Sequence, residues 1–298
     1  LAAEGHAATF TVTSAADTSG ASCGATCTLR QALNAANGSA GADTVAFNIP
    51  GAGPHRISTA STLPSASAVV IDGYTQPGAT ANTDPLASNA VLKIIIDARN
   101  LPAGNIGLAI SGASTLRGVS MIAPTSNVAI DLGTGNVSGC WFNVEPDAVT
   151  VVSSGTAVRM TAGQTALVGG PLAADRNVFA ASGAPASAIL AGASGAHTVQ
   201  GNLIGLRPDG QTPGAVGQAV VSSAISAGQL LIDNTIACTG NAVAMQSFGG
   251  VIQNNRFGTT VSGSEPACTT GRLSTGSGQR YSGNTFGYFN STPVSLAS

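Results

Sequence analysis

The chain has 298 residues with a net charge of −2, and only 8% of the residues are charged and 4% aromatic. So few charges exclude a disordered acidic or basic tail, and the scattered Lys and Arg residues do not form the clustered basic surface that binds nucleic acid. No run of about 18 apolar residues occurs, so we expect no segment to span a membrane. The hydrophobic residues, mostly small, suit a thin, elongated core.

The first expected elements are a strand and a helix. Polar and apolar residues alternate over residues 9–13, which predicts a strand, and residues 28–37 form the one convincing helix. Thr28 and Gln31 are spaced as a capping box. We expect this helix to plug the open end of a long β core, because its apolar residues recur on one face: Leu29, Ala32, Leu33 and Ala36.

Short strands separated by turn residues follow the helix. Residues 74–88 are polar and contain two prolines, so we expect a loop that projects from the body of the protein. On either side of this loop, runs of aliphatic residues predict strands over residues 44–49, 57–63, 69–71 and 91–96.

A short unit recurs in the second half of the chain. It consists of Asn, one further residue and a bulky apolar residue, and its spacing of 21 to 32 residues indicates a solenoid of stacked coils. We expect the Asn side chains to form an internal ladder with amides bonded from coil to coil. A ligand-binding or ice-binding face is the alternative, but no regular Thr-x-Thr repeat supports ice binding. The residues are Asn177, Asn202, Asn234, Asn255 and Asn284.

The N-terminal segments follow one another in a familiar order. Residues 27–37 read CTLRQALNAAN, and DTVAF at 43–47, LP at 63–64 and VIDGY at 70–74 come after them. This order resembles the N-terminal region of secreted bacterial right-handed parallel β-helix proteins with a C-S/T-L-R-E-A-type capping motif. Gln31 stands where that motif has Glu.

The resemblance implies an all-β fold, a right-handed parallel β-helix (solenoid) with a short N-terminal capping helix. It also implies a location at the cell surface. It does not assign a catalytic residue to any position of this chain. We therefore expect a single domain over residues 1–298, with the cap and first coil in 1–50 and further coils in 51–298.

The five cysteines of the chain indicate the cellular compartment in which the protein is found. Cys238 and Cys268 are 30 residues apart, about one coil, which is expected to place them at disulfide distance. Cys23 and Cys27 precede the helix and are expected to pair, which leaves Cys140 as a buried thiol. Two disulfides indicate an oxidising compartment, so we expect a secreted or cell-surface protein, in the periplasm or on the outer face of a bacterium. Because the chain begins at Leu rather than Met, we expect any signal peptide to be absent from it.

Two carboxylates are the first candidates for chemistry. Asp72 and Asp97 each follow an aliphatic strand end and are 25 residues apart, which predicts adjacent rungs about 4.8 Å apart. Such a pair is suited to acid–base catalysis or to Ca²⁺, the one cofactor we consider. The interpretation we favour is structural, with each Asp accepting backbone N–H groups at a turn. Arg99 is placed to neutralise either carboxylate.

The remaining candidates are single residues. His197 is the best candidate for a functional histidine, although a surface position at a turn is the more usual role. Trp141 and Tyr288 are candidates for stacking on sugar rings. Their more common roles are to fill the core and, for the C-terminal aromatic residues, to cover the end of the solenoid. Neither a catalytic triad nor paired metal ligands are indicated: His6, His55 and His197 are dispersed, and they show no metal-ligand spacing that would complete a site at Cys23 and Cys27.

Two functions remain open. We expect a non-enzymatic secreted or cell-surface protein, an adhesin, an envelope scaffold or a glycan-binding module, with a polysaccharide or cell-surface glycan as its partner. The alternative is a polysaccharide lyase or glycoside hydrolase that acts on an extracellular polysaccharide through Asp72 and Asp97. A part of a larger secretion or phage-derived assembly is a third hypothesis. No protein partner can be named from the sequence.

Overall fold

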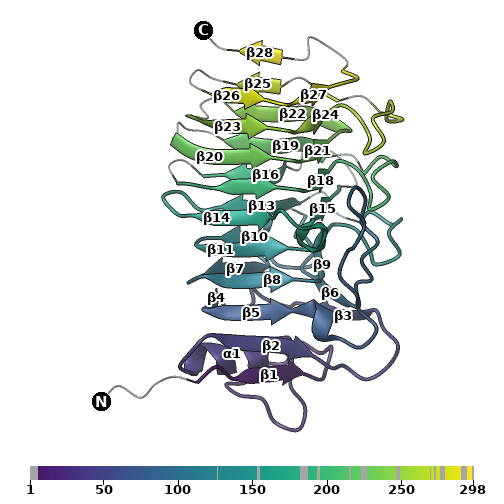
Figure 1. Ribbon diagram of the computed structural model, residues 1–298. Helices are drawn as coiled ribbons and strands as arrows, with labels where there is room; N and C mark the ends of the chain where they lie inside the picture. The colour runs from purple at the N-terminus through teal and green to yellow at the C-terminus, as the bar shows by residue number, and fades with distance from the viewer. Residues whose placement is uncertain are drawn as a thin grey trace.

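The chain winds as a right-handed parallel β-helix, as expected (Figure 1). In this computed structural model, each coil contributes one strand to each of three parallel sheets, so a strand pairs with strands one coil before and one coil after it. The structure describes residues 6–125, 127–152, 155–181, 187–192, 195–214, 216–222, 227–245, 249–268, 270–271, 273–275, 279–289 and 294–296.

The strands of the described residues divide among sheets A, B and C in the following order. Sheet A contains β1 (Thr9–Val12), β2 (Asp43–Phe47), β5 (Val69–Asp72), β8 (Ser114–Arg117), β11 (Gly135–Ser138), β14 (Ala166–Gly169), β17 (Thr198–Gln200), β20 (Ala227–Ile232), β23 (Gly249–Gln253) and β26 (Arg280–Ser282). Sheet B contains β3 (His55–Ser58), β6 (Ile94–Asp97), β9 (Ser120–Ile122), β12 (Trp141–Phe142), β15 (Val178–Phe179), β18 (Leu203–Ile204), β21 (Thr235–Ile236), β24 (Arg256–Phe257) and β27 (Thr285–Phe286). Sheet C contains β4 (Ala66–Ser67), β7 (Leu108–Ser111), β10 (Val128–Leu132), β13 (Thr156–Met160), β16 (Ser187–Ala191), β19 (Val216–Ser222), β22 (Thr239–Met245), β25 (Leu273–Thr275) and β28 (Val294–Leu296).

The core runs along the axis as ladders of apolar side chains. Side chains alternate between the two faces of a strand, and the parallel register places the inward residue of each coil directly over that of the previous coil. Phe142 and Phe179 stack in this way, with ring centroids 4.7 Å apart and planes only 2° from parallel. The inward ladder of sheet B comprises Ile57, Ile96, Met121, Phe142, Phe179, Ile204, Ile236, Phe257 and Phe286.

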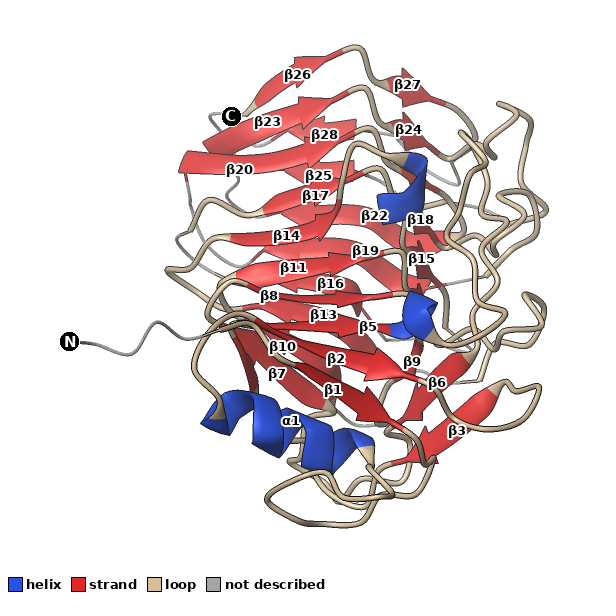
Figure 2. Cartoon of the chain, turned by 60° about the horizontal axis from the view of Figure 1, so that its bottom comes forward, coloured by secondary structure: helices blue, strands red, loops and turns tan. Residues whose placement is uncertain are grey.

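Helix α1 (Leu29–Gly38) lies across the N-terminal end of this core (Figure 2). The predicted capping box is confirmed, because the Thr28 side chain accepts from the backbone N–H of Gln31 and the Gln31 side chain accepts from that of Thr28. The helix contacts β1, β2 and β4. The residues that it buries against them are the four expected ones, Leu29, Ala32, Leu33 and Ala36.

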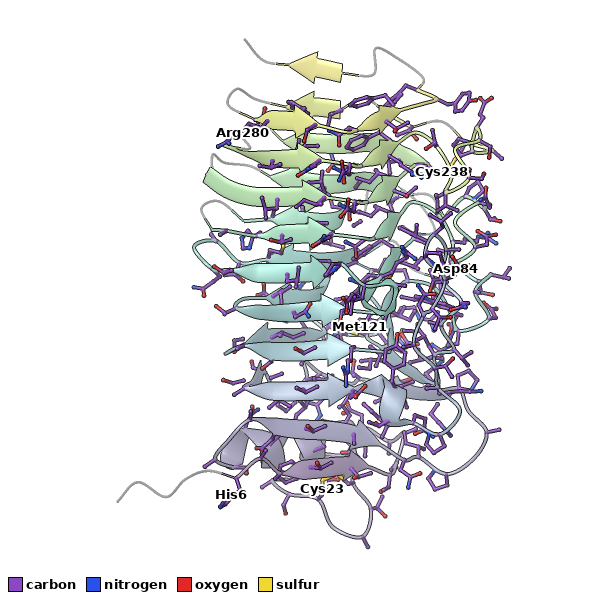
Figure 3. All side chains as sticks on the ribbon, viewed as in Figure 1. His6, Cys23, Asp84, Met121, Cys238 and Arg280 are labelled. Atoms are coloured by element: carbon purple, nitrogen blue, oxygen red, sulfur yellow. A yellow bond between two sulfur atoms is a disulfide. The ribbon has the colours of Figure 1, made fainter. Side chains whose placement is uncertain are left out.

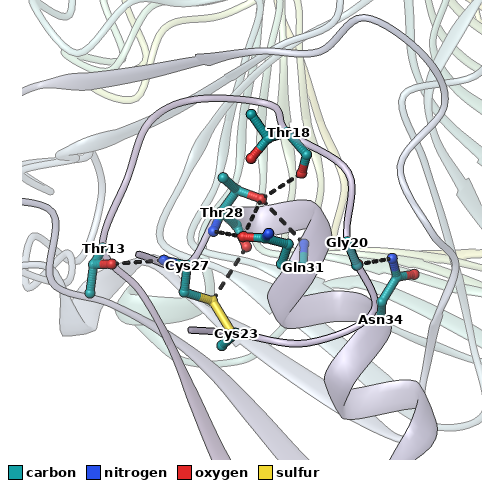
Figure 4. Close-up of a disulfide and its surroundings, with 8 residues drawn as sticks. All are labelled: Thr13, Thr18, Gly20, Cys23, Cys27, Thr28, Gln31 and Asn34. Carbon is teal, nitrogen blue, oxygen red and sulfur yellow. Dashed lines mark hydrogen bonds between the residues drawn. A yellow bond between two sulfur atoms is a disulfide. The ribbon is translucent and has the colours of Figure 1, made fainter. Parts of the chain in front are cut away.

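The loop that enters the helix is closed by the Cys23–Cys27 disulfide, as expected (Figure 4). Arg30 then fastens the helix to the first coil. Its guanidinium forms an ion pair with Asp17 at 2.8 Å and donates to the carbonyl oxygens of Thr62 and Ser61. These bonds tie the cap to two other segments.

The asparagine ladder is confirmed. The Nδ2 of each Asn donates to the Oδ1 of the next, at 3.0 Å from Asn177 to Asn202, 2.9 Å from Asn202 to Asn234, 3.0 Å from Asn234 to Asn255 and 3.1 Å from Asn255 to Asn284. Each Oδ1 also accepts the backbone N–H of the preceding ladder residue, so the ladder side chains satisfy a buried backbone donor in each turn between sheets A and B.

Cys140 occupies the ladder position one coil before Asn177. Its backbone N–H donates to Asn177 Oδ1 at 2.9 Å, and its thiol lies near the carbonyl oxygens of Ser138 and Leu116. Burial raises the pKa of this thiol to about 12. Cys140 is therefore the unpaired buried cysteine that the sequence predicted, and Cys238 and Cys268 form the second disulfide.

Candidate binding groove

Asp72 ends β5 and is engaged in holding the turn that follows. One carboxylate oxygen accepts the backbone N–H of Tyr74 at 3.1 Å, which begins the 3-10 helix η1 (Gly73–Thr75). The other oxygen is 2.6 Å from Arg117 Nη2 on the neighbouring strand β8. Asp72 is thus both a turn cap and one half of an ion pair.

Asp97 ends β6 and lies in a cluster of four charged residues. Its carboxylate is 2.7 Å from Arg99 Nη2 and 2.7 Å from Arg56 Nη1, and it also accepts the backbone N–H of Arg99. Arg56 in turn contacts Glu145 at 2.6 Å. Burial raises the pKa of Asp97, but the hydrogen bonds from Arg99 and Arg56 outweigh it and hold that pKa below its ordinary value.

The expectation that Asp72 and Asp97 stack on adjacent rungs is wrong. Asp72 lies in sheet A and pairs with Ala46 and Arg117, whereas Asp97 lies in sheet B and pairs with Ser58 and Ile122. The error came from the coil length. The coil from Asp72 to its neighbour Arg117 takes 45 residues, because it includes a long loop, so 25 residues cover only the step from one sheet to the next.

We expect Asp97→Asn to destabilise the fold by about 2 kcal/mol at neutral pH, because it removes charge-assisted hydrogen bonds at a buried position. The pKa of Asp97 is lower in the folded than in the unfolded chain, so its contribution is present above about pH 3.9 and is lost as the pH falls through the folded pKa. Urea unfolding of both proteins at pH 7 and pH 2.5 measures this difference.

Asp131→Asn is the matched control, because Asp131 forms a more exposed pair with Arg159 and should contribute about 0–1 kcal/mol. If Asp97→Asn instead stabilised the protein, or if added Ca²⁺ raised the melting temperature of the unmodified protein, Asp97 would belong to a functional site rather than to the scaffold.

The loop predicted over residues 74–88 does not project from the solenoid, contrary to expectation, and it is part of a longer segment, residues 73–93. They lie along the outer face of sheet B, and Asp84 sits beside coils much later in the chain (Figure 3). Trp141 is packed beneath this segment at 2% exposure, and its Nε1 donates to Ser88 Oγ at 3.2 Å. The Trp141 side chain is therefore inaccessible to a sugar ligand. It belongs to a second apolar cluster outside the β-helix, formed by Ala90, Leu92, Trp141, Val144, Val178, Ala180, Leu203 and Val261.

His197 is buried rather than exposed at a turn. Only 1% of its surface is accessible, it lies between sheets C and A, and both of its ring nitrogens lack hydrogen-bond partners. Burial lowers its pKa. It lines a space of about 10 Å³ with Gln229, which is room for about one water molecule, so it is closed to a larger ligand.

Tyr288 is 44% exposed near the C-terminal end of the described chain, where its backbone N–H donates to Gly258. The neighbouring Phe289 packs partly against the main core, and its ring lies 6.4 Å from that of Phe286. The C-terminal aromatic residues therefore divide between covering the last coils and facing solvent.

A groove opens where the tip of the 73–93 loop meets the corner between sheets A and B. It has a volume of about 220 Å³, and we call it the corner groove. Leu86 and Leu172 stand on its rim at 49% and 66% exposure. Its floor contains outward-facing residues of β18, β21 and β24. The lining comprises Pro85, Leu86, Gly170, Pro171, Leu172, Arg176, Gly201, Asn202, Leu203, Asp233, Thr235 and Arg256.

Arg176 holds the loop tip against the coils and so fixes the shape of the groove. Its guanidinium donates to the carbonyl oxygens of Asp84 at 2.7 Å, Ala87 at 2.6 Å and Pro85 at 2.8 Å, and to Gly201 at 3.2 Å. Burial lowers its pKa. Three of the four carbonyl acceptors lie about ninety residues from Arg176 in the sequence, so one wall of the groove is made from two distant parts of the chain.

A second cleft, of about 470 Å³, lies on the outer face of sheet C. It is lined mainly by small and aliphatic side chains such as Leu190 and Val221, and its two charged residues, Asp131 and Arg159, are paired with each other. The corner groove is smaller but presents charged groups that have no such partner. The corner groove is therefore the better candidate for a binding site.

A comparison of the chain with protein-family models matches none of them, and a search of curated proteins finds no match. Within the described part of the chain, no helix is long and apolar enough to cross a membrane. The same residues contain no group of three or more His, Cys, Asp or Glu side chains placed to hold a metal ion. The class that the structure defines is a disulfide-bonded right-handed parallel β-helix.

Proposed function

We propose that this protein is a non-enzymatic, secreted or cell-surface β-helix that binds a polysaccharide in the corner groove. The groove itself is the observation that carries the proposal. Exposed aliphatic side chains, Leu86 and Leu172, stand beside polar groups such as Thr235, Asp233 and Arg256. Sugar rings have an apolar C–H face and a hydroxyl edge, so a ligand of this class meets both kinds of surface.

The carboxylates that line the groove favour binding over cleavage. Glycosidases of the common type place two carboxyl groups about 5 to 9.5 Å apart across the scissile bond. Among the described residues that line the corner groove, Asp233 is the one carboxylate. Asp72 and Asp97, the candidates from the sequence, lie outside it and are each paired with arginine.

Two features support a location outside the cytoplasm. Both predicted disulfides form within the solenoid, one at the cap and one between neighbouring coils, and disulfides persist in oxidising compartments. The N-terminal segments also resemble those of secreted bacterial β-helix proteins. A surface location would place the groove within reach of extracellular polysaccharides.

Binding to a panel of neutral and acidic polysaccharides, measured by calorimetry with product analysis, tests the proposal. The double variant Leu86→Ser/Leu172→Ser should weaken binding about tenfold, because it removes the apolar rim. Its melting temperature should hardly change, since both side chains are exposed in the folded protein. Val149→Ser is the control, because the exposure of Val149, 59%, lies between those of the two rim residues, but Val149 is outside the groove.

Failure of every polysaccharide to bind would refute the proposal, and so would equal effects of the rim and control variants. The appearance of new reducing ends or unsaturated sugar products would instead establish the alternative, a glycoside hydrolase or a polysaccharide lyase.

A further inference from the structure

The arginines of this protein are usually neutralised by a carboxylate. Five of the nine in the described part of the chain form ion pairs at 2.6 to 2.8 Å. Arg176 and Arg256, which both line the corner groove, form none. The five paired residues are Arg30, Arg56, Arg99, Arg117 and Arg159.

The charges lining the groove do not cancel. They are two guanidinium groups, of Arg176 and Arg256, against the single carboxylate of Asp233, which pairs with neither of them. The guanidinium of Arg176 donates to four backbone carbonyl oxygens. These acceptors are neutral, so they do not cancel the positive charge of Arg176. The residues that line the groove therefore carry an excess of one positive charge, which favours an anionic group on the ligand.

Arg256 has donors to offer a ligand. It lies on β24 with its side chain on the outer face, and it makes one side-chain hydrogen bond, from Nη1 to the carbonyl oxygen of Val261 at 2.8 Å. A guanidinium has five N–H groups, so most of its donors are without a protein acceptor. Their planar arrangement matches the two oxygens of a carboxylate or a sulfate.

Groups that suit sugar hydroxyls line the same groove. Thr235 is directly across from Arg256 on the neighbouring strand. Asp233 is exposed, and one of its carboxylate oxygens accepts from Gln200 Nε2 at 3.2 Å, which leaves the other oxygen as an acceptor for a hydroxyl group. An anionic group and a hydroxyl group of one sugar therefore find complementary partners on adjacent coils.

We propose that the corner groove selects an acidic polysaccharide, whose carboxylate or sulfate group binds Arg256 and whose hydroxyl groups bind Asp233 and Thr235. This inference rests on the proposed function, because it names the class of polysaccharide that the same groove takes. The ligand that fits best is a uronic acid polymer, since a sugar carboxylate allows a two-point contact with the guanidinium.

Calorimetry with oligogalacturonate, its methyl ester, dextran sulfate and neutral dextran tests the inference. Oligogalacturonate should bind at least about tenfold more tightly than its uncharged ester. Arg256→Gln should remove this preference, and Arg256→Lys should restore only part of it, because lysine keeps the charge but not the planar contact. Tight binding of dextran sulfate would identify the charge, rather than the carboxylate, as the recognised feature.

Arg280→Gln is the matched control. Arg280 forms no ion pair either and carries the same charge on a late coil, but it lies on sheet A, away from the groove (Figure 3). It should leave the preference unchanged. Equal loss in the Arg280 and Arg256 variants, or equal affinity for the acid and its ester, would overturn the inference while the proposed function stands. Absence of binding to all four polymers, and to every polysaccharide of the wider panel, would refute both.

Discussion

Leu33→Asp is expected to abolish soluble, folded protein. Leu33 is completely buried in α1 and packs on the first coils of the solenoid. Placing a carboxylate there without a partner costs several kcal/mol, even after a shift in its pKa, and a domain of this kind has only about 5–15 kcal/mol of net stability. Displacement of the helix would also expose the unpaired edge of β1 and the apolar end of the core, which favours aggregation. Soluble yield and urea unfolding measure the effect.

Ala35→Asp is the control for this variant. Ala35 lies in the same helix but is half-exposed, so its carboxylate can remain hydrated and the protein should stay folded. Unchanged urea unfolding of the Leu33→Asp protein would show that the helix does not close the core. Equal loss of both variants would show that added charge anywhere on the helix is harmful, which would contradict the role of its buried face.

Asn234→Ala is expected to give the second largest effect, a loss of about 3–5 kcal/mol. The Asn234 side chain accepts from the side chain and backbone N–H of Asn202, and it donates to Asn255 and to the carbonyl oxygens of Val199 and Ile232. Alanine makes none of these bonds, so several buried polar groups lose their partners at about 1–3 kcal/mol each. Chemical denaturation checks the loss.

Asn284→Ala serves as the comparison, since Asn284 is the last rung of the ladder in the described chain and is only half-buried. Water can replace its lost bonds, so we expect less than half the effect of the Asn234 change. Similar losses at both rungs would mean that the ladder stabilises each coil independently. A negligible loss at Asn234 would show that the ladder contributes little to stability.

The cap and the ladder were predictable from sequence because each depends on local spacing. Thr28 and Gln31 are three residues apart, and their mutual hydrogen bonds follow from helix geometry. The ladder depends on one residue type recurring once per coil. Its start was missed, because Cys140 takes the place of Asn in the coil before Asn177, and no sequence pattern marks a thiol as a substitute for an amide.

The corner groove was not predictable, because its walls come from segments that touch only after the coils have stacked. Arg176 donates to the carbonyl oxygens of residues 84, 85 and 87, and nothing in the sequence indicates this contact. The same loop caused the error at Asp72 and Asp97, since its extra residues lengthen one coil and change which positions are neighbours. Periodicity predicts the average coil, whereas the proposed binding groove is formed by the exceptional one.

A crystal structure of the protein soaked with oligogalacturonate is the most direct test of polysaccharide binding in the corner groove. We expect intact sugar rings over Leu86 and Leu172, with a carboxylate within hydrogen-bond distance of Arg256. An oligosaccharide in the sheet C cleft beside Asp131 and Arg159, or cleaved products in either place, would contradict this account.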